Sequence, residues 1–244
     1  MKISIILPTF NERDNIIDLI IEIQKNLDND QWDYEILVVD DNSPDGTASA
    51  VQDYRDKHGS EILCLVRKEE RGLASAIKYG IQTAQGDIVV VMDTDFNHDP
   101  KMIPQMIKFL EYYDLVIGSR FVVGGGMEER QRYYYSLLYN LFVRSILRLQ
   151  VQDNLSGFFA TRKEMIMCLN VDYIFRGYGE YFIRLLYLAH RKRYKILEVP
   201  VFYILRRHGQ SKSSFFSMLV EYTKCVLDLR FRNKIKLELS ITNG

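Results

Sequence analysis

The first 120 residues alternate short apolar runs with stretches of helical periodicity. The runs cover residues 3–7, 35–39, 61–66, 88–92 and 114–118, and we expect each to be a strand. Most are continuous rather than alternating, which predicts strands that are buried on both faces, as in a parallel sheet covered by helices. The pattern therefore predicts an α/β chain with a Rossmann-like, mostly parallel sheet flanked by helices.

Helices are expected between these strands, and they dominate the chain after Gly124. Apolar residues recur at helical spacing over residues 16–27, and Gly46 and Thr47 open the next helix. The remaining predicted elements are helices at 72–84, 101–112, 132–149 and 180–192, a strand at 195–199 and a final helix from Phe215. The second half is thus expected to include a helical, basic C-terminal extension.

Acidic residues follow three of the predicted strands directly. Glu12 comes after the first, Asp40 and Asp41 end the second, and Asp93 and Asp95 follow the fourth. The carboxyl ends of strands in an open α/β sheet are where ligands bind. Crowded carboxylates repel one another unless a cation or hydroxyl donors lie between them. These positions therefore predict a site for a divalent metal and a nucleotide sugar.

The two best-defined acidic segments also have structural explanations. The spacing of Asp93 and Asp95 is weak evidence alone, because such pairs arise by chance in solvated loops; Asn97 adds a further oxygen ligand. Residues 42–47 are turn formers and a helix cap. That explanation does not cover the doubled acid before them, and we favour Asp41 as an acceptor for ribose hydroxyls or base amines.

The net charge of zero conceals a strong asymmetry between the two halves. Residues 1–129 hold 12 Lys+Arg against 24 Asp+Glu, whereas residues 130–244 hold 20 against 8, so the halves carry −12 and +12. The basic half is expected to meet an anionic partner such as phosphate, nucleic acid or a membrane surface, unless the halves simply attract each other. No RNA-binding or helix-turn-helix pattern is present, which makes nucleic acid the weakest of these partners.

Three cysteines and the apolar stretches bear on the compartment. The odd number and wide spacing of Cys64, Cys168 and Cys225 predict buried thiols in a reducing environment. The sequence starts with a predicted strand and shows no signal-peptide pattern. No apolar run approaches the roughly 20 residues that cross a bilayer. We therefore expect a cytoplasmic protein that touches a membrane without spanning it.

A polar stripe follows the helix predicted at 132–149. Arg132, Ser136 and Asn140 recur every four residues, while leucine, tyrosine, phenylalanine and valine fill the positions between them. The stripe either faces water or lines a site.

Six segments, in this order, resemble the motifs of dolichol-phosphate mannose synthases, which are polyprenyl-phosphate glycosyltransferases of glycosyltransferase family 2. The segments are 8–12 (PTFNE), 40–47 (DDNSPDGT), 71–74 (RGLA), 92–100 (MDTDFNHDP), 118–125 (GSRFVVGG) and 156–158 (SGF). The resemblance extends from residue 3 to about residue 213. It implies a GT-A fold, a nucleoside diphosphate sugar donor, Mg²⁺ or Mn²⁺, and a polyprenyl phosphate acceptor.

The resemblance also implies roles for individual residues. The donor would be bound by Pro8, Glu12, Asp41, Asp93, Arg206 and Lys212, and the metal would be held by Asp93, Asp95 and Asn97. The acceptor phosphate would be bound by Arg132 and Ser136. The residues expected to serve catalysis are Asp95, Arg120, Arg132 and Ser136. The acceptor phosphate has a second pKa of about 6, so it is already anionic and needs no strong base. Direct displacement would invert the anomeric carbon.

The chain departs from the family at three positions. Leu205 replaces an acid, Phe159 replaces an arginine, and an aromatic residue is missing near Glu128. Mannose from GDP-mannose is the expected donor chemistry. UDP-glucose or another UDP-sugar, a saccharide acceptor, and a non-catalytic nucleotide-sugar-binding subunit remain alternatives.

We expect three parts along the chain. Residues 1–125 would be the nucleotide-sugar-binding half of the GT-A domain, residues 126–213 the acceptor-binding and loop part of the same catalytic domain, and residues 214–244 an amphipathic helix and tail. The face of the final helix that includes Leu219, Val226 and Leu229 would either lie on a membrane or pack on the sheet domain. A peripheral position on the cytoplasmic face is expected, with a possible membrane-anchoring partner subunit.

Overall fold

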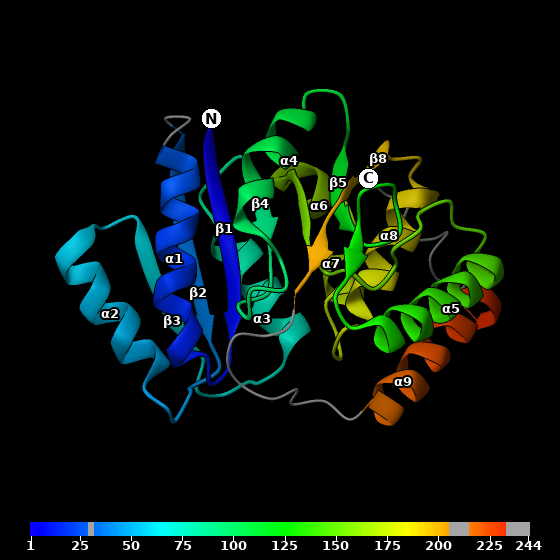
Figure 1. Cartoon of the computed structure of the whole chain (residues 1–244), viewed down its shortest axis with the longest axis horizontal. Helices are drawn as coiled ribbons and strands as arrows, with labels where there is room; N and C mark the ends of the chain where they lie inside the picture. Colours follow the sequence, from blue (N-terminus) through cyan, green and yellow to red (C-terminus); the bar gives the residue numbers. More distant parts are fainter. Residues whose placement is uncertain (29–31, 205–214, 233–244) are drawn as a thin grey trace.

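A seven-stranded sheet forms the centre of the molecule (Figure 1). The computed structural model describes residues 1–28, 32–204 and 215–232. The strands are β1 (Lys2–Thr9), β2 (Asp33–Asp40), β3 (Ile62–Val66), β4 (Ile88–Val91), β5 (Leu115–Ser119), β7 (Phe159–Arg162) and β8 (Ile196–Pro200). Their order across the sheet is β3-β2-β1-β4-β7-β5-β8.

Most strand pairs are parallel, as the sequence predicts. β1 pairs in parallel with β2 and β4, β2 with β3, and β5 with β8. β7 is antiparallel to both of its neighbours, β4 and β5. The sequence analysis missed β7, and with it the link that joins β4 to β5. Phe159 and Ala160 of β7 are fully buried, so this position belongs to the core of the sheet.

Helices cover both faces of the sheet. They are α1 (Arg13–Asp28), α2 (Thr47–His58), α3 (Leu73–Thr83), the 3₁₀ helix η1 (Pro100–Met102), α4 (Ile103–Phe109), α5 (Arg130–Leu147), α6 (Lys163–Met167), α7 (Val171–Ile174), α8 (Tyr181–Arg191), α9 (Phe215–Leu227) and the π-helix η2 (Asp228–Arg232). Helices α1, α2 and α4 contribute to one core cluster, and α3, α6, α7 and α8 contribute to the other.

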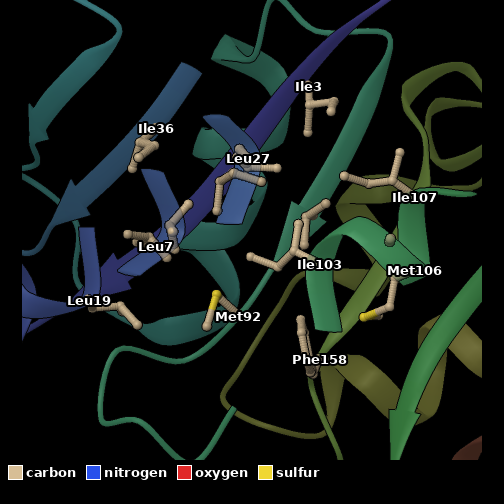
Figure 2. Packing of buried hydrophobic residues seen from close by; sticks show 14 of the residues in the cluster. Ile3, Leu7, Leu19, Leu27, Ile36, Met92, Ile103, Met106, Ile107 and Phe158 are labelled. Carbon is tan, nitrogen blue, oxygen red and sulfur yellow. The ribbon is translucent and has the colours of Figure 1, made fainter. Parts of the chain in front are cut away.

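Side-chain alternation along β1 explains the two clusters. Ile5 and Leu7 belong to the cluster with α1, whereas Ile6 belongs to the cluster with α3. Neighbouring side chains on a strand point to opposite faces, so an uninterrupted apolar strand needs apolar cover on both sides. Figure 2 shows part of the first cluster, where Leu19 and Ile103 lie near Leu7 and Met92.

Helices α5 and α9 lie side by side at the end of the molecule away from α2 (Figure 1). A third cluster joins them to α8 through Val143, Ile183 and Val226, among others. Two short strands, β6 (Gly126–Met127) and β9 (Phe202–Tyr203), form a small parallel sheet. In the chain, β6 comes just before α5 and β9 comes just after β8. These short strands were not predicted either.

The structure favours one alternative for the last helical segment and corrects the expectation that all three cysteines are buried. Val226 of α9 and Leu229 of η2 are buried in the cluster with α5 and α8, so these two side chains pack on protein. Cys168 is exposed and Cys64 only half-buried, whereas Cys225 is buried as expected. In the described parts of the chain, no helix has the length and apolar character that a membrane span needs.

Candidate active site

A cavity of about 300 Å³ lies at the carboxyl ends of β1, β2 and β4, and we call it the strand-end cavity. It is lined by Pro8, Thr9, Phe10, Glu12, Asp41, Arg71, Gly72, Leu73, Ala76, Asp93, Thr94, Asp95 and Tyr178. The predicted carboxylates from three strand ends therefore meet in one space. Parallel strands place their carboxyl ends at one edge of the sheet, which is why carboxylates as far apart in the chain as Glu12 and Asp95 converge here.

Asp41 is held by an arginine that the sequence analysis did not single out. The guanidinium of Arg67 donates to Asp41 Oδ1 through Nε at 2.8 Å and also through Nη2. The main-chain N–H of Gly72 donates to Asp41 Oδ2 at 2.7 Å. Arg67 and Asp41 are both buried. Asp41 thus lines the cavity as predicted, but its charge is already paired and its orientation is set from within the protein.

Asp93 and Asp95 differ in their surroundings. Asp95 is buried and accepts hydrogen bonds from the main-chain N–H of Asn97 at 3.1 Å and from its Nδ2 at 2.8 Å. The side chain of Asp93 is 42% exposed. Asn97 orients Asp95 and does not line either of the cavities described here.

The carboxylates fit a magnesium or manganese ion bound together with a substrate. In the described residues, no three Asp, Glu, His or Cys side chains are grouped so that they could hold a metal by themselves. Magnesium is usually bound through one or two carboxylates plus substrate phosphates and water. Asp93 and Asp95, which line the same cavity, match this way of binding magnesium and do not match a site whose ligands all come from the protein.

His98 supports the loop that carries Asp93, and the sequence analysis missed this residue. The imidazole is fully buried, and its Nδ1 accepts a hydrogen bond from the main-chain N–H of Asp93 at 2.8 Å. Its Nε2 lies 2.7 Å from Tyr203 Oη and 3.2 Å from the carbonyl oxygen of Ser156. With Nδ1 accepting, the neutral ring carries its proton on Nε2. His98 therefore ties the Asp93 loop to β9.

A second cavity, of about 450 Å³, opens between α5, α9 and the loop before α8, and we call it the helix cavity. Its polar lining includes Arg120, Arg132, Ser136 and Ser156, and its apolar lining includes Leu138, Phe142, Leu155 and Leu219. Burial raises the pKa of Tyr139, Tyr181 and Tyr222, which also line it, so their hydroxyls stay neutral at physiological pH.

The polar stripe of α5 faces this cavity and the protein interior. Arg132 and Ser136, one turn apart, both line the helix cavity. Asn140, the next residue in the stripe, is buried; its Oδ1 accepts from the main-chain N–H of Asn154 at 2.6 Å, and its Nδ2 donates to the carbonyl oxygen of Ser136 at 2.9 Å. The water-facing alternative is therefore wrong for Asn140, whereas Ser136 is half-buried and Arg132 is exposed.

Arg120 lies in the wall of the helix cavity with its charge already balanced. Its Nε and Nη2 each donate to one carboxylate oxygen of Asp153 at 2.7 Å, and its guanidinium lies 4.7 Å from the centre of the Tyr203 ring. Both members of the ion pair are buried. Asp153 was also missed by sequence reasoning, since it lies 33 residues away in a loop without a recognisable motif.

The two cavities meet. Leu73, Asp93 and Tyr178 line both of them, so a group bound in one cavity can reach the other at this junction. Arg206 and Lys212, predicted to cover the donor, and Leu205 lie outside the described residues.

The family model described as glycosyl transferase family 2 matches residues 4–169. The chain belongs to this family. That assignment confirms the sequence-based prediction of a family 2 glycosyltransferase.

Two curated relatives of this family 2 chain carry related names. A dolichol-phosphate mannosyltransferase of Pyrococcus furiosus is 36% identical over 87% of the chain, which spans 59% of that protein's length. An undecaprenyl-phosphate mannosyltransferase of Micrococcus luteus is 31% identical, with 88% of each chain covered.

Solved structures confirm the GT-A fold. Glucosyl-3-phosphoglycerate synthase of Mycobacterium tuberculosis, crystallised with Mn²⁺, UDP and phosphoglyceric acid, matches with a TM-score of 0.70 at 20% identity, covering 94% of this chain and 78% of that chain. At this identity the likeness speaks for the fold alone. Within it, the acids of this family 2 chain occupy the strand ends and the arginine–serine pair occupies α5.

Proposed function

We propose that the protein is an inverting glycosyltransferase that moves a hexose, mannose from GDP-mannose, onto the phosphate of a polyprenyl phosphate. The observation that carries the proposal is the junction of two unlike cavities at Asp93. One is lined by acids at strand ends, and the other combines an arginine and a hydroxyl with apolar walls. The names of the two mannosyltransferase relatives support the same reaction.

The strand-end cavity would bind the donor. Glu12 and Asp41 line the part formed by β1 and β2 and would accept hydrogen bonds from the nucleoside, with Asp41 held in place by Arg67. Asp93 and Asp95 would hold a divalent cation, which supplies positive charge against the diphosphate as it leaves. Asn97 would act indirectly, because its two hydrogen bonds orient the Asp95 carboxylate.

The helix cavity would bind the acceptor. The Arg132 guanidinium can donate two hydrogen bonds to one phosphate, and the Ser136 hydroxyl can donate another. Leu138, Phe142 and Leu155 line the same cavity and suit the first part of a prenyl chain. An acceptor phosphate that is already anionic attacks without a strong base, so positioning and charge neutralisation account for most of the catalysis.

The lipid acceptor implies work at a membrane surface. Tyr134, Tyr135, Leu138 and Leu141 of α5 are each between 44% and 64% exposed. They lie on the helix that lines the proposed acceptor site, so an interfacial position there would bring the lipid phosphate to Arg132. We propose a peripheral protein on the cytoplasmic face of a membrane, with α5 rather than the buried face of α9 toward the lipid.

The test is transfer of labelled sugar from GDP-mannose, UDP-glucose or UDP-N-acetylglucosamine to a short polyprenyl phosphate, with Mn²⁺, Mg²⁺ or EDTA. We expect label in the lipid phase with GDP-mannose and a divalent ion, and none with EDTA. Label transferred to the lipid from a UDP-sugar would support the proposed reaction but would mean that the donor is that UDP-sugar and not GDP-mannose. Donor binding without labelled lipid under any condition would contradict the proposed acceptor.

A further inference from the structure

The loop between α7 and α8 places Tyr178 where the two cavities meet. Of the residues at the junction, Leu73 comes from α3 and Asp93 follows β4, so Tyr178 is the aromatic member. A sugar that passes from a donor in the strand-end cavity to an acceptor in the helix cavity has to pass this point. The side chains that bound the junction are therefore the ones placed to contact the transferred group.

The backbone of this loop is tightly held. Gly177 has a φ of 75°, and a Cβ at that position would lie 1.8 Å from Glu180 Oε1. A Cβ at Gly179 would lie 1.9 Å from Tyr222 Oη. The main-chain N–H of Tyr178 donates to Glu180 Oε2 at 2.9 Å. Two glycines thus let the chain on both sides of Tyr178 approach polar groups at distances that a side chain would prevent.

A buried ion pair between Glu180 and Arg184 holds the loop in place. Glu180 is 8% exposed and lies 3.6 Å from Arg184 of α8. Arg184 is also buried, and its guanidinium donates to the carbonyl oxygens of Ile174 and Arg176. Arg184 therefore contacts the main chain at the start of the loop and also the Glu180 carboxylate, which accepts a hydrogen bond from the main-chain N–H of Tyr178. Such a network restricts the loop to one conformation.

Tyr178 itself does not pack into the core, because it is 43% exposed although its loop is anchored by buried charges. A rigid backbone that presents a large ring to a cavity junction suits substrate contact better than stability. An aromatic ring packs against the C–H face of a hexose, and a phenol forms hydrogen bonds with sugar hydroxyls.

We propose that Tyr178 contacts the transferred hexose, positions it for attack and keeps water from its anomeric carbon. This inference rests on the proposed function. In productive transfer, the bond from C1 to the diphosphate oxygen breaks, its electron pair leaves with the nucleoside diphosphate, and a bond from C1 to the acceptor phosphate oxygen forms. When water attacks instead, free sugar and a proton are released. Tyr178 favours the first outcome.

The test compares Tyr178→Ala and Tyr178→Phe with the matched control Tyr79→Ala. Tyr79 lies on α3, is 44% exposed and lines neither cavity. In Tyr178→Ala we expect kcat for lipid transfer to fall at least about tenfold and the share of donor hydrolysis to rise, with nucleoside diphosphate affinity within about twofold of wild type. In Tyr178→Phe, which removes one hydrogen bond, we expect the ratio of kcat/KM for GDP-mannose and GDP-glucose to change roughly threefold or more.

Two results would overturn the inference. One is a wild-type ratio of transfer to hydrolysis in both Tyr178 variants and in Tyr79→Ala. The other is an equal loss of nucleotide binding and transfer in Tyr178→Ala with a lowered melting temperature, which would mean a structural role. If the wild-type protein transfers no sugar from any donor, the proposed function fails on its own account and the role of Tyr178 in transfer fails with it.

Discussion

At the scale of single residues, buried ion pairs surround the proposed donor and acceptor sites. Arg67 pairs with Asp41 beside the strand-end cavity, and Asp153 pairs with Arg120 beside the helix cavity. Each pair takes two charges out of water, which is costly unless the geometry and further hydrogen bonds compensate. Such pairs fix the orientation of the cavity-facing member, so binding a substrate does not require that member to be reordered.

Arg67→Met is predicted to destabilise the protein by roughly 3 kcal/mol or more, because it leaves the Asp41 carboxylate buried without its partner. The neighbouring variant Lys68→Met removes a charge from an exposed side chain and should change stability by less than about 0.5 kcal/mol. Chemical denaturation of both variants measures the difference. Equal stability of the two would mean that the pair does not hold Asp41.

Asp95→Asn is predicted to reduce metal-dependent transfer at least about a hundredfold, because the amide has one fewer oxygen and no charge for the cation. The control is Asp99→Asn. Asp99 lies four residues on, is exposed and accepts a hydrogen bond from the main-chain N–H of Lys101 at 3.0 Å, which an asparagine can also do. Turnover of both variants at saturating Mn²⁺ gives the answer. Near wild-type activity in Asp95→Asn would refute the metal assignment.

At the scale of elements, α5 has three differently used sides. Arg132 and Ser136 line the helix cavity, Val143 and Leu147 pack in the third cluster, and Leu138 is largely exposed although it also lines the cavity. A helix has three to four residues per turn, so residues four apart share a side and neighbouring residues do not. One helix can therefore form a wall of the acceptor site, pack on α9 and expose an apolar rim.

Arg132→Ala is predicted to lower kcat/KM for the polyprenyl phosphate roughly 30-fold, as expected for the loss of about 2 kcal/mol from hydrogen bonds to a charged group. In the same variant, the KM for the donor sugar nucleotide, measured by its hydrolysis without lipid, should equal that of the wild type. Arg130→Ala is the matched control, since Arg130 is exposed at the start of the same helix and does not line the cavity. The assignment of the acceptor site is wrong if the two variants lose acceptor kcat/KM to the same extent.

Leu229→Ala is predicted to cost about 2–5 kcal/mol, because Leu229 is 1% exposed in the cluster that joins α5, α8 and α9. Leu227→Ala, at a position that is 41% exposed, should cost less than about 1 kcal/mol. Denaturant titration of both variants separates the two faces of this region. A larger loss in Leu227→Ala would mean that the exposed side carries the packing.

At the scale of the whole molecule, the acidic half and the basic half of the sequence line different cavities. The acidic residues 1–129 contribute most of the lining of the strand-end cavity, and the basic residues 130–244 contribute most of the helix cavity. An acidic half suits cation binding, and a basic half suits a phosphate lipid at an anionic surface. Helices α5 and α9, which belong to the basic half of the sequence, lie at the end of the molecule away from α2 (Figure 1).

The protein is predicted to bind vesicles that contain anionic lipid and polyprenyl phosphate, and to lose binding as salt rises from about 0.05 to 0.5 M because screening weakens the attraction. The double variant Leu138→Asp/Leu141→Asp should bind less than wild type, since it puts charge on the apolar rim of α5. Tyr112→Asp is the control at a residue of similar exposure outside α5. Co-sedimentation measures all three proteins, and equal binding would exclude α5 as the contact.

The strands and acids of the first half were predictable because their signals are local. Five apolar runs corresponded to β1–β5, and four of the acids predicted after β1, β2 and β4 line the strand-end cavity, namely Glu12, Asp41, Asp93 and Asp95. β7 escaped prediction because its residues, Phe159–Arg162, end in a threonine and an arginine and form no continuous apolar run, and its pairing with β4 and β5 joins distant parts of the chain. His98 escaped because its partners at Ser156 and Tyr203 are 58 and 105 residues away.

The sequence by itself determined the fold class, the family and the placement of acids at one edge of the sheet, since periodicity, motif order and strand ends are written in consecutive residues. Only the tertiary structure decided that Arg67 balances Asp41, that Asp153 balances Arg120, and that Tyr178 stands where the two cavities meet. The physical reason is that these arrangements depend on which distant side chains share a buried volume, and burial is settled by packing of the whole chain.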